Sequence, residues 1–202
     1  MEHCITFTSE GTILEGMLET PGTKRGVVIT HPHPLYGGDM DNPVVLAITE
    51  SYRKAGFATL RFNFRGAGNS EGDFDEGHGA VRDLLAAVYR LKSEGIEDVT
   101  CAGYSFGTWI CLSASLAHPV TTDVMVAPPV TFLDFQATPC HRGPNLVISG
   151  TQDSFADFET VKGMVPAWNP DARLHVIESA DHFFSIHLNE VSRAIDEHLS
   201  GA

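Results

Sequence analysis

Hydrophobic and polar positions along this 202-residue chain follow two periods, which predict strands and helices in alternation. Residues 3–7 and 12–19 alternate with a period of two on either side of Ser9-Glu10-Gly11, which predicts a β-hairpin. Further along, short apolar runs rich in β-branched residues and bounded by turn signals predict buried strands. These runs cover residues 26–30, 57–63, 99–102, 122–127, 145–150 and 172–178.

Helical spacing of apolar residues separates these strands. Asn42 is suited to an N-cap and Pro43 to the first helical position, and the helix that they begin is predicted to end at Gly56. Other helices are predicted between the glycine-rich loop 65–72 and Gly95, over 106–117, near 157–165 and at the C-terminal end. The apolar faces of the first, second and last helices are Val44, Val45, Ile48 and Tyr52, then Val81, Leu84, Leu85, Val88 and Leu91, then Leu188, Val191, Ile195 and Leu199.

This order of elements predicts an α/β fold. No internal repeat, low-complexity tract or linker divides the chain, so we expect one domain over residues 1–202. Strands that alternate with helices after an N-terminal antiparallel hairpin indicate a mostly parallel central sheet with helices on both faces. In such a sheet ligands bind at the C-terminal ends of the strands, which is where the polar motifs of this chain fall.

The motif Gly103-Tyr104-Ser105-Phe106-Gly107 lies between a predicted strand and a predicted helix. A serine on such a turn has strained backbone geometry, so the residues two before and two after it must be very small. The helix that follows directs its N-terminal N–H groups and positive dipole end toward the place where an oxyanion forms. This context favours Ser105 as a catalytic nucleophile over a chance match to the pattern.

A serine nucleophile needs a base, and the base needs an acid that orients it. His182 follows the strand that ends near Glu178, and Asp153 follows the strand that ends near Ser149. Both therefore lie at C-terminal strand ends, as Ser105 does. Asp181 and Asp157 are the alternative acids, although a capping or bracing role in its loop suits Asp181 better.

Composition narrows the range of functions. Asp and Glu number 26 against 13 Lys and Arg, a formal net charge of −13, which argues against binding nucleic acid or an anionic membrane surface. Cys4, Cys101, Cys111 and Cys140 lack the paired spacing of a metal site and are expected to be reduced packing residues. The N-terminal residues do not resemble a signal peptide and no apolar run is long enough to span a membrane, so we expect a soluble cytoplasmic protein.

Together with the serine motif, Arg65-Gly-Ala-Gly-Asn-Ser-Glu-Gly72 and His31-Pro-His-Pro-Leu-Tyr-Gly-Gly38 make almost the whole chain similar to the α/β-hydrolase superfamily. The chain order Ser105, Asp153, His182 is also that of this superfamily. The double His-Pro resembles a group of small, lidless bacterial hydrolases generally described as carboxylesterases. The sequence resembles dienelactone hydrolases too, but those carry cysteine where this chain has Ser105, which counts against their reaction.

The resemblance implies an oxyanion hole made by two backbone N–H groups. One is that of Phe106, and the other comes from the loop after the strand that ends at His31. His33 is the favoured second donor and Leu35 the alternative, because the prolines at 32 and 34 have no N–H. His31 and His33 also form a His-x-His pair, but no further ligand follows at suitable spacing, so we expect no metal and no cofactor.

These features predict a serine hydrolase that cleaves small carboxylic esters through an acyl-enzyme, with small-molecule acyl esters as its partners. A thioesterase or an aminoacyl peptidase would use the same three residues. A binding protein on the same fold is the alternative from a different class. Residues 128–144 alone separate two of the predicted strands at the usual place of a lid, so no lid domain is expected.

Overall fold

A central eight-stranded sheet organises the chain, whose residues 1–135, 140 and 142–201 are described by a computed structural model. The strand order across the sheet is β1-β2-β4-β3-β5-β6-β7-β8. The strands are β1 (His3–Ser9), β2 (Thr12–Glu19), β3 (Arg25–Thr30), β4 (Ala58–Phe62), β5 (Asp98–Tyr104), β6 (Thr121–Val126), β7 (Leu146–Gly150) and β8 (Arg173–Ile177).

The sheet is mixed but mostly parallel, as predicted. β1 pairs antiparallel with β2, and β2 pairs antiparallel with β4, whereas every pairing from β4 to β8 is parallel. The hairpin turn places Glu10 at φ 48° and Gly11 at φ 89°, the left-handed geometry that matches the twist of two adjoining strands. The C-terminal ends of β3 to β8 therefore share one edge of the sheet.

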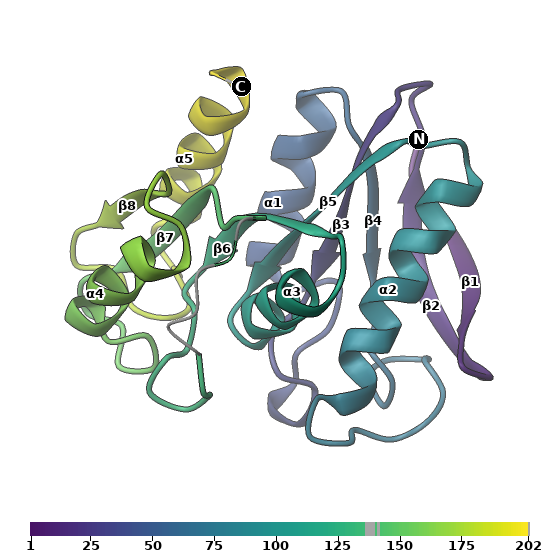
Figure 1. The fold of residues 1–202 in the computed structure, drawn as a ribbon, viewed down its shortest axis with the longest axis horizontal. Coiled ribbons are helices and arrows are strands. Elements are labelled where there is room, and N and C mark those ends of the chain that lie inside the picture. Colours follow the sequence, from purple (N-terminus) through teal and green to yellow (C-terminus); the bar gives the residue numbers. More distant parts are fainter. Residues whose placement is uncertain (136–139, 141, 202) are drawn as a thin grey trace.

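Helices cover both faces of the sheet (Figure 1). α2 and α3 lie next to each other on the near face of that view, and α1 lies behind the sheet, where it packs against α5. The helices are η1 (Pro34–Tyr36, a 3₁₀ turn), α1 (Pro43–Lys54), α2 (His78–Ser93), α3 (Phe106–Ala117), α4 (Phe158–Trp168) and α5 (Leu188–Ser200). None of the described helices is long and apolar enough to cross a membrane.

The predicted apolar face of α1 is buried against the sheet, and its four residues are at most 1% exposed. The Asn42 side chain accepts a hydrogen bond from the N–H of Val44, as expected of an N-cap. On the predicted apolar face of α2, Leu84, Val88 and Leu91 are buried, whereas Val81 and Leu85 are half-buried. The buried side of this helix also includes Ala80, Asp83 and Ala87.

The connection between β6 and β7 is short, and its described residues, 127–135, 140 and 142–145, contain no helix. Backbone N–H groups of Phe132 and Leu133 donate to the carbonyl of Pro129, which makes a tight turn. The described part of this connection thus holds no lid domain, as predicted.

Candidate active site

Ser105 occupies the sharp turn between β5 and α3, at φ 53° and ψ −123°. This left-handed geometry is uncommon for a residue with a side chain and is maintained by the surrounding structure. A Cβ atom on Gly103 would lie 2.6 Å from the backbone carbon of Gly107, and one on Gly107 would lie 2.6 Å from the carbonyl oxygen of Thr30. Both flanking glycines are therefore required by close backbone packing.

The Thr30 side chain joins this turn to the neighbouring strand. Its hydroxyl Oγ1 lies 3.0 Å from the carbonyl oxygen of Gly107 and 3.2 Å from that of Ala102. These are the carbonyls that precede and follow the serine turn. A buried threonine at the end of β3 thus holds the end of β5 and the first turn of α3 together.

The structure brings Ser105, His182 and Asp153 into one hydrogen-bonded series. Ser105 Oγ lies 2.9 Å from His182 Nε2, and His182 Nδ1 lies 2.8 Å from Asp153 Oδ2. The other carboxylate oxygen of Asp153 accepts hydrogen bonds from the N–H groups of Phe155 and Ala156, each at 2.8 Å. A carboxylate can only accept a hydrogen bond, so His182 Nδ1 carries the ring proton and donates it to Asp153. The lone pair of His182 Nε2 then faces the hydroxyl of Ser105.

The two alternative acids lie elsewhere. Asp157 is the N-cap of α4, where its carboxylate accepts from the N–H and hydroxyl of Thr160, and these bonds lower its pKa. Asp181 is exposed, and its carboxylate makes no hydrogen bond to His182 within the described residues. Asp153 is thus the carboxylate that contacts the imidazole.

Tyr104 holds the loop that carries the histidine. Its buried hydroxyl donates to the backbone carbonyl of His182 at 3.0 Å. Burial and the nearby carboxylates of Asp153 and Asp181 raise the pKa of Tyr104, so the hydroxyl stays protonated and remains a donor. Tyr104 was not among the predicted site residues, although it lies within the serine motif.

The loop after β3 places two histidines in different environments. His31 is fully buried, and its Nε2 accepts a hydrogen bond from the N–H of Phe64 at 3.0 Å. Its Nδ1 must then carry the proton, which it donates to the carbonyl of Pro32 at 2.6 Å. Burial lowers the pKa of His31 to about 4, against the opposing effect of that hydrogen bond. His31 is therefore neutral, and both its ring nitrogens are engaged in shaping the loop.

His33 lines the pocket beside Ser105, and its ring packs between those of Tyr36, Phe74 and Phe106, with centroids 4.6–5.0 Å apart. Its Nδ1 accepts a hydrogen bond from the N–H of Leu35 at 3.2 Å. The N–H of Leu35 is thus already bonded. No hydrogen bond occupies the backbone N–H of His33 in the part of the chain that the structure describes.

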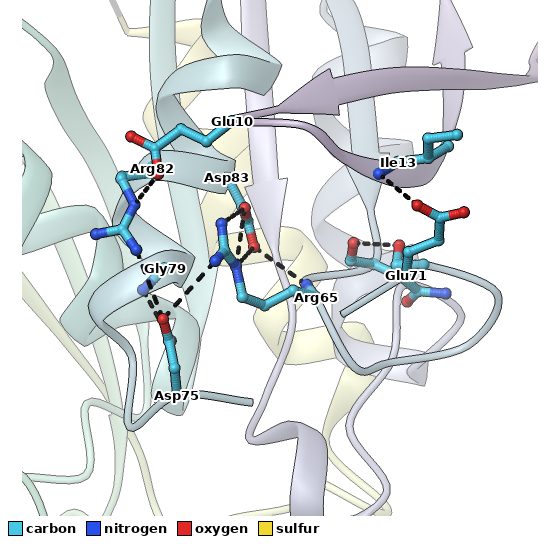
Figure 2. Close-up of polar contacts among 10 residues, drawn as sticks. Glu10, Ile13, Arg65, Glu71, Asp75, Gly79, Arg82 and Asp83 are labelled. Carbon is cyan, nitrogen blue, oxygen red and sulfur yellow. Dashed lines mark hydrogen bonds and ion pairs between the residues drawn. The ribbon is translucent and has the colours of Figure 1, made fainter. Parts of the chain in front are cut away.

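Polar contacts tie the glycine-rich loop after β4 to α2 and to the N-terminal hairpin (Figure 2). The Arg65 guanidinium bonds the fully buried carboxylate of Asp83 on α2 at 2.7–3.3 Å, and it lies 3.7 Å from Asp75. A Cβ atom on Gly79 would lie 2.2 Å from that guanidinium, so a larger residue there would have to displace the Arg65 side chain. Glu71 pairs with the backbone of β2 and ties the loop to the hairpin.

A pocket of about 590 Å³ opens at Ser105 and His182. Its walls come from the loops after β3, β5, β6, β7 and β8, all of them at C-terminal strand ends. The lining residues are Pro32, His33, Tyr36, Gly37, Gly38, Asn42, Tyr104, Ser105, Phe106, Pro129, Phe132, Leu133, Phe155, His182 and Phe183. Among the described residues no group of three or more His, Cys, Asp and Glu side chains is arranged to hold a metal ion.

Known proteins resemble this chain over nearly its whole length. An alpha-beta serine hydrolase homologue from Coxiella burnetii has a TM-score of 0.90 and 33% identity, covering 98% of this chain and 97% of that one. The chain belongs to the α/β serine hydrolases. A lidless α/β serine hydrolase from Xanthomonas campestris has a TM-score of 0.89 and 26% identity, covering 99% and 94% of the two chains.

An uncharacterized protein of Rickettsia prowazekii is 34% identical over 184 residues, which is 85% of this chain and 77% of that protein. No family model matches the sequence. Membership of the α/β serine hydrolases confirms the resemblance drawn from the motifs, and the lidless Xanthomonas structure agrees with the short connection between β6 and β7.

Three phenylalanines in the pocket of this α/β serine hydrolase were not predicted as site residues. Phe155 was not a candidate, yet it lies directly against His182. Phe132 and Phe183 line the pocket, whereas Phe135 and Phe184, from the same two loops, are buried in the core. The available signal was an aromatic residue two positions after Asp153, in a loop at a C-terminal strand end.

Proposed function

We propose that this protein hydrolyses small carboxylic esters through an acyl-enzyme, with residues 1–202 acting as one catalytic domain. The observation that carries the proposal is the hydrogen-bonded series from Ser105 through His182 to Asp153, which begins at a strained serine and opens into a pocket. Ser105 is the nucleophile, His182 the general base and acid, and Asp153 the group that orients the imidazole.

The reaction follows from this geometry. His182 Nε2 takes the proton of Ser105 Oγ as that oxygen attacks the ester carbonyl carbon, and the imidazolium is stabilised by Asp153. The proton then passes to the leaving alkoxide, the carbon–oxygen bond breaks, and the alcohol departs. Water attacks the acyl-enzyme in the same way, which releases the carboxylic acid and restores Ser105.

Charge on the carbonyl oxygen is stabilised by the N–H groups of Phe106 and His33. The N–H of Phe106 is at the N-terminus of α3, where the helix dipole adds to the effect. Because Leu35 already donates to the His33 side chain, the free N–H of His33 is the better second donor. Each such donor contributes about 3–4 kcal/mol to transition-state stabilisation.

A fluorophosphonate probe tests the nucleophile. The probe should attach to Ser105 alone, and peptide mapping by mass spectrometry identifies the site. Ser105→Ala should abolish both labelling and hydrolysis of p-nitrophenyl acetate, whereas Ser200→Ala at the end of α5 should change neither. An active wild-type protein with unlabelled Ser105 would contradict the assignment.

A substrate panel tests the reaction class. Matched acetyl esters, acetyl thioesters and aminoacyl amides are compared by kcat/KM, and we expect the esters to rank first. A higher value for the thioester or the amide would assign the same three residues to a different leaving group. No turnover and no labelling of any member would favour a binding protein.

A further inference from the structure

Three phenylalanines beside His182 expose large apolar surfaces. Phe132, Phe155 and Phe183 are 67%, 37% and 59% exposed, and we call them the phenylalanine trio. They come from three separate loops, after β6, β7 and β8. An exposed apolar cluster at the mouth of a pocket is typical of a ligand-binding surface rather than of ordinary protein surface.

The trio packs around the imidazole. The ring of Phe155 lies 4.8 Å from that of His182, and the ring of Phe183 lies 5.6 Å away and nearly perpendicular to it. Phe132 stacks on Phe155 at 5.1 Å with an angle of 29° between the rings. The three rings therefore form one aromatic wall that continues outward from the catalytic base.

Hydrogen bonds hold this wall in place before any ligand arrives. The N–H of Phe155 donates to Asp153, and its carbonyl accepts from the hydroxyl of Thr131 at 2.6 Å. The N–H of Phe132 donates to the carbonyl of Pro129 at 3.0 Å. Two of the three rings thus have fixed backbones, which lowers the entropy lost when a ligand binds.

The described part of the pocket lining offers no charged partner. No Lys, Arg, Asp or Glu is found among the described residues that line it. The whole chain has a formal net charge of −13, which repels anions at long range. A substrate group that enters this pocket should accordingly be uncharged. An anionic group would lack a charged partner there and would also be repelled by the net negative charge.

We propose that the phenylalanine trio binds the alcohol part of the ester, and that this part is an uncharged aromatic group such as a benzyl alcohol. The inference rests on the proposed function. His182 Nε2 returns the serine proton to the leaving oxygen, so the leaving alcohol must lie next to the imidazole. Phe155 and Phe183 flank that imidazole, and they therefore contact the alcohol rather than the acyl group.

A benzyl ester would react in two steps, acylation of Ser105 and hydrolysis of the acyl-enzyme. A bond forms between Ser105 Oγ and the acyl carbon, and the bond between that carbon and the benzyl oxygen breaks. The proton from Ser105 passes through His182 to the benzyl oxygen, which leaves as benzyl alcohol. Water then hydrolyses the acyl-enzyme, and no further reactant is needed.

Benzyl acetate and cyclohexylmethyl acetate make the matched test. They share the acyl group and have leaving alcohols of similar basicity and size, but cyclohexylmethyl is the more hydrophobic. Purely apolar contact would favour cyclohexylmethyl acetate or neither. Ring-to-ring contact should favour benzyl acetate by about 3- to 10-fold in kcat/KM, the range that aromatic pairs add beyond area burial. 4-Carboxybenzyl acetate should be at least about 10-fold poorer than benzyl acetate, because its carboxylate finds no partner in the pocket.

Variants locate the contact. Phe132→Leu and Phe155→Leu should each bring the benzyl to cyclohexylmethyl ratio close to one. The ratio is measured within each variant, so a smaller folded fraction does not affect it. Tyr89→Leu removes an exposed ring on α2 away from the pocket, and it should leave both the ratio and the activity unchanged.

The outcomes separate this inference from the proposed function. Ester hydrolysis that depends on Ser105, with no preference for benzyl acetate, would overturn the inference and leave the function standing. A benzyl preference that survives in both phenylalanine variants would also overturn it. Absence of any ester hydrolysis would overturn the proposed function, and the inference with it.

Discussion

At the residue scale, His182 is held by hydrogen bonds to both its imidazole ring and its backbone carbonyl. Its ring bonds Ser105 and Asp153, and its backbone carbonyl bonds the hydroxyl of Tyr104. Asp153, in the loop after β7, therefore orients the ring, while Tyr104, at the end of β5, holds the backbone. Changes at Asp153 and at Tyr104 should accordingly have different consequences.

Asp153→Asn should lower kcat by roughly 10⁴-fold, as the equivalent change does in serine proteases, because an amide can donate to Nδ1 and favours the wrong tautomer. Asp181→Asn is the matched control, since that carboxylate is exposed and does not contact the imidazole. Steady-state kinetics on p-nitrophenyl acetate measures both. A larger loss in Asp181→Asn than in Asp153→Asn would show that the acid is wrongly assigned.

Tyr104→Phe should lower the free energy of unfolding by about 1–3 kcal/mol, because it leaves the buried carbonyl of His182 without a partner. It should also lower kcat, since the histidine loop loses a contact. Urea unfolding and steady-state kinetics measure the two effects. Tyr89→Phe, which removes an exposed hydroxyl, should change neither, and equal stability of the two variants would refute the role given to Tyr104.

The three residues of the hydrogen-bonded series were predictable because each leaves a local signal. Ser105 lies in a spaced glycine motif, and His182 and Asp153 each follow a strand. Tyr104 and Phe155 were not predictable in this way, because their importance comes from a contact between loops distant in the sequence. An apolar or aromatic letter in a loop does not by itself show which side chain it faces.

At the scale of elements, the turn from β5 to α3 depends on close backbone packing rather than on apolar burial. Thr30 at the end of β3 occupies the space that a side chain on either flanking glycine would need. The two glycines thus let three elements meet at Ser105. The packing role of these glycines can be distinguished from glycine's general flexibility by comparison with a glycine that has no close neighbours.

Gly107→Ala should destabilise the protein and remove most activity, because the new methyl group would lie 2.6 Å from the carbonyl of Thr30. Overpacking of this kind costs about 1–3 kcal/mol. Gly163→Ala in α4 is the control, since nothing lies within 4 Å of its added Cβ. Alanine there should stabilise by about 0.5–1 kcal/mol. Thermal and urea unfolding compare the two, and a Gly107→Ala protein of wild-type stability and activity would contradict the packing argument.

Hydrophobic periodicity predicted the order of strands and helices because most strands are buried and most helices bury one face against the sheet. It was less complete on α2, where Ala80 and Ala87 are buried beside the predicted residues and the buried Asp83 pairs with Arg65. Alanine is common on both exposed and buried faces of helices, so it contributes little to a hydrophobic period. An aspartate is expected to be exposed unless the arginine that pairs with it is known. The 3₁₀ turn η1 was also unpredicted, since three residues are too few for periodicity.

At the scale of the whole molecule, a second polar cluster, outside the pocket lining, joins β6, α1 and α5. The buried carboxylate of Asp123 on β6 accepts from Tyr52 on α1 at 2.5 Å and from Asn145 at 2.9 Å, and it bonds His198 on α5 at 2.9 Å. Burial raises the pKa of Asp123, but the hydrogen bonds from His198, Tyr52 and Asn145 outweigh it and bring the pKa below its usual value. The cluster therefore couples stability to pH.

The direction of this pH dependence follows from the difference in the pKa of Asp123 between the folded and unfolded states. The folded state holds Asp123 ionised more strongly than the unfolded state does, so its contribution is full above the unfolded pKa of about 3.9 and is lost as pH falls through the lower folded pKa. Asp123→Asn should cost about 1.5–3 kcal/mol at pH 7. The difference from wild type should shrink below about pH 4. Urea unfolding at pH 7 and pH 3 tests this, and a constant difference would exclude Asp123 as the titrating group.

The open pocket limits the acyl group that this fold can use. No helix covers Ser105 from the described part of the β6–β7 connection, and the pocket holds about 590 Å³. Each added methylene gains about 0.8 kcal/mol only while it is buried, so the gain ends once the pocket is filled. In a p-nitrophenyl ester series, kcat/KM should peak at short acyl chains and fall for long ones. With no lid to open, activity should also not rise when the substrate passes its solubility limit and forms an interface. A preference for long chains, or a marked rise at an oil–water interface, would show that another part of the chain covers and extends the site.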